Sequence, residues 1–168
     1  MWFWILATVI LLFGFVAFLG APYVPSKRRE LRHAFEHLYP LGRSDVLVDI
    51  GSGDGVVLRE AAKRGARAIG YELNPVLAWF SRWISRRYKG IEVHVANMWN
   101  ISFPEEVTVV YVFAVSRDSK KLEGMMQSEA NRMKKSLKLI SYGCKLPSKI
   151  PIKTSGAHFL YDFLPLQG

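Results

Sequence analysis

The first twenty residues differ in hydrophobic pattern from the rest of the chain. Residues 2–19 (WFWILATVILLFGFVAFL) carry no charge, and Lys27 is the first ionisable side chain. As a helix these residues would reach about 27 Å, close to the hydrocarbon thickness of a bilayer. The run has no basic residue before it and no small-residue cleavage site after it, unlike a cleaved signal peptide. We therefore expect residues 1–20 to form a transmembrane anchor.

After the anchor, short apolar runs alternate with amphipathic stretches. Ser26 is expected to cap a basic helix that ends near Leu38. Asn74 and Pro75 suit the N-cap and the first position of another helix. We predict strands at residues 45–50, 68–72, 92–96, 107–112 and 137–142, and one or two more within 150–164. Helices are expected at residues 55–64, 75–89 and 119–135. This alternation predicts an α/β fold, a parallel sheet with helices on both faces.

Composition narrows the class of protein. The single cysteine, Cys144, excludes a disulfide scaffold, and the 13 % of aromatic residues excludes a disordered chain. The net charge of +9 first suggests a nucleic-acid partner. However, basic residues begin directly after the anchor, which favours contact with lipid headgroups and a cytoplasmic domain, or one on the matrix side of an organelle. We expect no nucleic-acid partner.

A glycine loop follows the strand at 45–50. Gly51-Ser-Gly-Asp-Gly55 lies just after Asp49, and Glu72 ends the next predicted strand. The carboxyl ends of parallel strands form a nucleoside-binding crevice, where glycines allow close approach and a carboxylate accepts bonds from ribose hydroxyls. The loop lacks the G-x-G-x-x-G spacing of dinucleotide binders, which disfavours a nicotinamide dehydrogenase. Two acids in it suit a ligand that carries an ammonium and a sulfonium.

The stretch DIGSGDG resembles motif I of the class I S-adenosylmethionine-dependent methyltransferases. Other stretches narrow the resemblance because they occur in one order, namely PYVPS, DIGSGDG, GYELNP, WFSRW, NMW, VYVFAV and CKLP. Together they resemble the single-span, membrane-anchored protein-lysine methyltransferases of mitochondria and their prokaryotic relatives. Known members of that family act on the ATP synthase c-subunit and the adenine nucleotide translocase.

The resemblance implies a Rossmann-like methyltransferase sheet and S-adenosyl-L-methionine as cofactor, with no metal. It implies a linker and basic helix at 21–44 that cover the cofactor, and a methyltransferase domain at 45–168. Asn97 and Trp99 are the candidate catalytic residues, although Asn97 stands where the family usually has aspartate. The candidate cofactor-binding residues are Tyr23, Pro25, Ser26, Asp49, Gly51, Ser52, Gly53, Asp54, Gly55, Glu72, Leu73, Asn97 and Met98.

The leading hypothesis is methyl transfer to a lysine of a membrane or membrane-proximal protein, with the bilayer as a second partner through residues 1–20. An alternative is a small-molecule or phospholipid N-methyltransferase, and another is a cofactor-binding membrane assembly factor without catalysis. Trp79 and Tyr23 could join Trp99 in an aromatic wall around an amine. For Trp79, with Phe80 and Trp83, a place in the core or an interface is the favoured interpretation.

Overall fold

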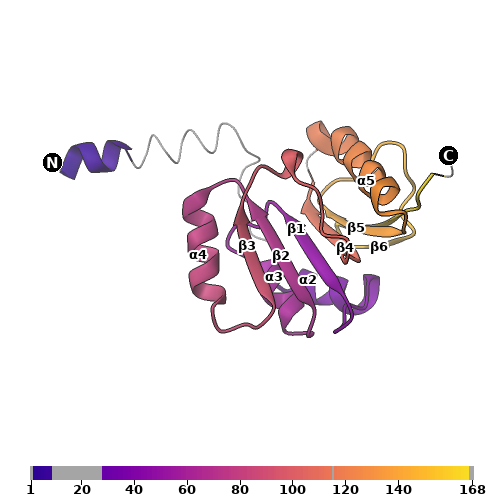
Figure 1. Cartoon of the computed structure of the whole chain (residues 1–168), viewed down its shortest axis with the longest axis horizontal. Helices are drawn as coiled ribbons and strands as arrows, with labels where there is room; N and C mark the ends of the chain where they lie inside the picture. Colours follow the sequence, from indigo (N-terminus) through magenta and orange to yellow (C-terminus); the bar gives the residue numbers. More distant parts are fainter. Residues whose placement is uncertain (1, 9–27, 115, 167–168) are drawn as a thin grey trace.

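The computed structural model describes residues 2–8, 28–114 and 116–166, and Figure 1 shows their arrangement. Seven strands in this part of the chain form one sheet, in the order β3-β2-β1-β4-β5-β7-β6. The first five strands run parallel, whereas β7 is antiparallel to both of its neighbours. The strands are β1 (Val46–Ile50), β2 (Arg67–Glu72), β3 (Ile91–Val95), β4 (Val109–Phe113), β5 (Leu137–Tyr142), β6 (Lys153–Ser155) and β7 (His158–Phe163).

The five central strands and the two further strands confirm the sequence predictions. The sheet is mixed rather than wholly parallel, because two residues alone join β6 to β7. A connection of that length makes a hairpin, and a parallel pair would need a crossover of a dozen residues or more. Gly156 lies in this turn at φ 58°, in the left-handed region that favours glycine.

The expected helices are present, with different ends. The helices are α2 (Arg28–His33), the π-helix η1 (Ala34–Leu38), α3 (Val56–Ala62), α4 (Pro75–Ser85), the 3-10 turns η2 (Met98–Asn100) and η3 (Ser116–Asp118), and α5 (Ser119–Met133). The basic helix therefore finishes as a π-helix at Leu38, and α4 ends at Ser85 instead of near residue 89. The cap of α4 is confirmed, since Asn74 Oδ1 accepts from the backbone N–H of Val76 at 2.9 Å.

Residues 2–8 form a further helix with exposed aromatic side chains. Across the described ranges 2–8, 28–114 and 116–166, no helix is both long and apolar enough to cross a membrane. Most of the anchor expected at 1–20 lies outside the described residues, as does the predicted cap, Ser26.

The core consists of two apolar layers, one on each face of the sheet. Alternate strand residues face opposite layers, so Leu47 and Val109 join one layer while Val48 and Val110 join the other. Side chains from α2, η1, α3 and α4 complete the first layer, and α5 covers the second. Helices on both faces were predicted, and the structure confirms them with an unequal distribution.

A buried aromatic cluster joins β7 to the rest of the fold. His158 Nε2 and Tyr111 Oη are 3.1 Å apart, and the His158 ring stacks on Tyr142 with centroids separated by 4.5 Å. Tyr142 Oη also donates to Glu30 Oε2 of α2 at 2.9 Å. Burial lowers the pKa of His158 from 6.5 to about 4, against the weaker opposing effect of Glu30.

This depressed pKa predicts a pH-dependent stability. As pH falls from 6.5 towards 4, the unfolded chain takes up a proton at His158 that the folded chain refuses, so the folded state is destabilised. Between about pH 7 and pH 5 we expect this group to remove about 2 kcal/mol from the free energy of unfolding. His158→Gln, which keeps a partner for Tyr111 but does not titrate, should lack this part of the pH dependence in urea unfolding of the detergent-solubilised chain. Equal slopes for both proteins would contradict the assignment.

Candidate active site

The ends of β1, β2 and β3 meet at one edge of the sheet. Asp49 is the penultimate residue of β1, and Glu72 is the last residue of β2. Glu72 is in register with Val95 of β3, and its carbonyl accepts the N–H of Ala96 at 3.0 Å. Asn97 follows directly. The structure thus gathers Asp49, Glu72 and Asn97, predicted from separate motifs, along the edge where α/β sheets bind nucleosides.

The glycine loop packs closely on β2. The N–H groups of Gly51 and Ser52 both donate to Tyr71 O, at 2.8 and 3.0 Å. Gly51, Gly53 and Gly55 have φ values of 87°, 52° and 77°, as the sequence predicted for a loop that needs glycine. A Cβ on Gly55 would lie 2.2 Å from Ser81 Oγ of α4. The last glycine is therefore required both by its conformation and by the helix behind it.

The half-buried carboxylate of Glu72 bridges the two segments that flank the crevice. Its Oε2 accepts the N–H of Gly53 and its Oε1 accepts the N–H of Asn74, each at 2.8 Å. A carboxylate has about four acceptor positions, so these two bonds leave capacity for ribose hydroxyls. Leu73, another predicted cofactor residue, is exposed beside Glu72.

Asp49 is the most deeply buried acid of the site. Its side chain is 2 % exposed, and among the described residues no donor reaches Oδ2. Burial raises the pKa of Asp49 well above its ordinary value, and the charges of Glu72 and Asp54 raise it further. The buried Oγ of Ser52 likewise has no partner in the described part of the chain. Buried polar atoms are normally hydrogen-bonded, so these two fit a ligand with a cationic donor such as an ammonium.

Asp54 makes contacts that the sequence did not predict. Its Oδ2 lies 3.1 Å from Nη2 of Arg59, which is itself buried, and its Oδ1 accepts the N–H of Val56 at 3.1 Å. The acid thus holds the start of α3, and its contact with a cofactor stays a prediction. The signal for Arg59 was an arginine in an otherwise apolar turn, five residues after an acid.

The segment after β3 forms the other side of the site. Asn97 Oδ1 accepts the N–H of Trp99 at 3.1 Å and so caps η2. Met98 and Trp99 pack against the apolar layer below α5. Lys121 of α5, which sequence reasoning missed, places its Nζ 4.2 Å from the centroid of the Trp99 ring. The Trp99 face therefore binds an ammonium group already in the folded chain.

Tyr23, Pro25 and Ser26 lie outside the described residues, so their predicted place in the site stays a prediction. Where the chain is next described, Glu30 is bonded to Tyr142, the last residue of β5. Because β5 is parallel to β1–β4, α2 begins at the edge of the sheet that carries Asp49 and Glu72.

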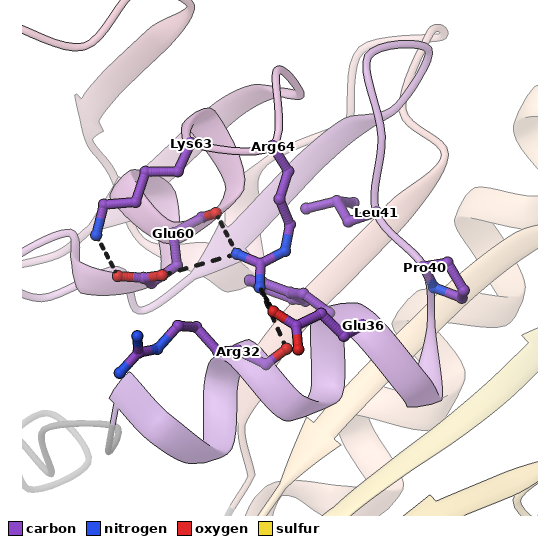
Figure 2. A pocket seen from close by; sticks show the side chains of 8 residues that line it. Arg32, Glu36, Pro40, Leu41, Glu60, Lys63 and Arg64 are labelled. Atoms are coloured by element: carbon purple, nitrogen blue, oxygen red, sulfur yellow. Dashed lines mark hydrogen bonds and ion pairs between the residues drawn. The ribbon is translucent and has the colours of Figure 1, made fainter.

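A hollow between α2, η1 and the end of α3 is separate from this site. Figure 2 shows Arg64 at its centre, bonded to Arg32 O at 3.2 Å and to Glu36 Oε1 at 2.8 Å, while Lys63 binds Glu60. The hollow is lined by the last residues of α3, and the glycine loop precedes the first. Its charges bind one another, which gives it a structural explanation.

Comparison with solved structures shows the fold. An RNA methyltransferase from Salinibacter ruber, solved with S-adenosyl-L-homocysteine, matches 86 % of this chain and 95 % of its own, with a TM-score of 0.73 and 23 % identity. Geranyl diphosphate C-methyltransferase from Streptomyces coelicolor matches 67 % of this chain and 45 % of its own, with a TM-score of 0.54 and 24 % identity. The architecture is that of a Rossmann-like methyltransferase.

Sequence comparison shows the family. The lysine N-methyltransferase of the ATP synthase c-subunit from Xenopus laevis is 39 % identical over 115 residues, which cover 66 % of this chain and 49 % of the relative. Adenine nucleotide translocase lysine N-methyltransferase from mouse is 30 % identical over 142 residues, 82 % of this chain and 59 % of the relative. The chain spans about half the length of the curated relatives it matches. Residues 49–153 match the model of the ANTKMT methyltransferase domain, and the chain belongs to that family.

Proposed function

We propose that the chain transfers a methyl group from S-adenosylmethionine to a lysine of a membrane or membrane-proximal protein. The observation that carries this proposal is the pair of carboxylates at the ends of β1 and β2 in a chain of this family. Asp49 is buried with an oxygen that needs a donor, while Glu72 is fixed by two backbone N–H groups. Relatives that are 39 % and 30 % identical are named as lysine methyltransferases of membrane proteins.

The residues of the crevice fit the cofactor part by part. Asp49 and the loop Gly51–Gly55 would hold its amino-acid end, Glu72 its ribose, and Asn97 with Met98 its adenine. The bound cofactor would supply a methyl group on a positively charged sulfur. A charge-assisted bond of the kind Glu72 offers contributes roughly 1.5–3 kcal/mol. Asn97 can accept from an adenine amine as aspartate does, but without a negative charge.

In the proposed reaction the methyl–sulfur bond breaks as a bond forms to a neutral lysine nitrogen. S-adenosylhomocysteine leaves, and the proton that the methylated amine releases goes to solvent. The chain must align the amine and remove water from it, which also favours its neutral form. Trp99 supports this role because its ring already lies against the ammonium of Lys121. We assign no general base.

We further propose that residues 1–20 anchor the chain in a bilayer and that residues 21–44 cover the cofactor. The domain would lie on the cytoplasmic side, or on the matrix side in an organelle. The uncharged run at 2–19 and the basic residues after it support the anchor. The bond between Glu30 and Tyr142 supports the cover, since it brings the start of α2 to the crevice.

The function is tested by methyl transfer in native membranes. Full-length protein is incubated with membranes and methyl-labelled S-adenosylmethionine, and the lipid and protein fractions are separated. We expect label in protein, recovered as methylated lysine after hydrolysis, and none in lipid. Label in extracted lipid would instead support a phospholipid N-methyltransferase. Cofactor binding without any label would support an assembly factor without catalysis.

The ribose assignment is tested by calorimetry with S-adenosylhomocysteine. Glu72→Ala should weaken binding by about one to two decades, since about 1.4 kcal/mol corresponds to a factor of ten. Glu92→Ala is the matched control, because Glu92 lies on the neighbouring strand but binds exposed Arg67. The control should bind as the wild type does. Binding by Glu72→Ala that equals the wild type would refute the assignment.

A further inference from the structure

Helix α4 has its large apolar side chains on the outside. The residues that face the sheet are small, namely Ala78, Ser81 and Ser85. The exposed stripe consists of Val76, Trp79, Phe80 and Trp83, with Leu73 just before the helix. Their spacing of three and four residues puts them on one face. The favoured placement of Trp79 in the core is therefore wrong, since its side chain is 63 % exposed, and the interface interpretation is left.

The aromatic stripe is already ordered in the folded chain. The rings of Phe80 and Trp83 stack with centroids 6.2 Å apart, and the Arg86 guanidinium lies 5.0 Å from the Trp83 ring centroid. Arg82 turns back towards the sheet and donates to Val93 O. Figure 1 shows α4 at the β3 end of the sheet, so among the described residues its outer face has no helix or strand against it.

The charge around the stripe selects its partner. Residues 73–91 contain four basic side chains, Arg82, Arg86, Arg87 and Lys89, and no acid. Tryptophan next to arginine and lysine is the composition of helices that lie in a membrane interface, where basic groups meet anionic lipid headgroups. A second copy would bring like charges together, which disfavours a symmetric dimer through this face.

We propose that α4 lies in the interface of an anionic bilayer, with Trp79, Phe80 and Trp83 among the headgroups and Arg86, Arg87 and Lys89 against lipid phosphates. This contact is additional to the anchor and requires neither cofactor nor methyl transfer. It has a consequence for the site, because α4 begins two residues after Glu72. Docking through α4 holds the crevice at the membrane surface.

The proposal is tested by lipid quenching of a probe on α4. Val76→Cys in a Cys144→Ala background is labelled with the dye NBD and reconstituted, as the full chain, in vesicles that contain phosphatidylglycerol and quencher-labelled lipid. Ser128→Cys is the control, because it is exposed on α5 on the other face of the sheet. We expect blue-shifted, quenched emission at position 76 and unquenched emission at position 128. Equal, unquenched emission at both positions would overturn the proposal.

Two further arms separate lipid from other partners. Arg86→Glu with Arg87→Glu should abolish the quenching at position 76, and so should vesicles of phosphatidylcholine alone. A blue shift at position 76 without lipid quenching would mean that protein covers α4, and would also overturn the proposal. Each sample's methyl transfer is measured separately, so failure of the membrane contact is distinguishable from failure of the proposed activity.

Discussion

Glu72 connects the glycine loop after β1 to the start of α4 through its two carboxylate oxygens. One oxygen accepts the N–H of Gly53 and the other accepts the N–H of Asn74, so a single side chain fixes both walls of the crevice. Asn74 in turn caps α4, and Gly55 packs against Ser81 of the same helix. The position of α4, the conformation of the loop and the acceptors offered to a nucleoside thus depend on one group.

The parts of this arrangement that were predictable are local ones. Glycines at 51, 53 and 55, an acid at the end of each of two strands, and the Asn74-Pro75 start of a helix can all be read within a few residues. The missed contacts join distant segments. Arg59 meets Asp54 through the first turns of α3, and Tyr142 meets Glu30 across 112 residues. Only the folded sheet brings such residues together.

The orientation of α4 shows why periodicity alone was insufficient. The sequence displays an apolar stripe, and such a stripe normally faces the core. Here the helix runs so close to the glycine loop that a Cβ on Gly55 would approach Ser81 Oγ to 2.2 Å. Only small side chains fit that interface, so Ala78, Ser81 and Ser85 turn inward and the aromatic residues turn outward. The fold leaves a binding surface where the pattern suggested a core.

The measurement that tests this account most directly is the position of S-adenosylhomocysteine in an experimentally determined complex with the full chain. We expect its ribose hydroxyls on the carboxylate of Glu72, its ammonium near Asp49 and its adenine beside Asn97 and Met98. A ligand bound instead in the hollow lined by Glu36 and Arg64 would contradict the account. So would a complex in which Glu72 keeps its two backbone bonds but touches no ligand atom.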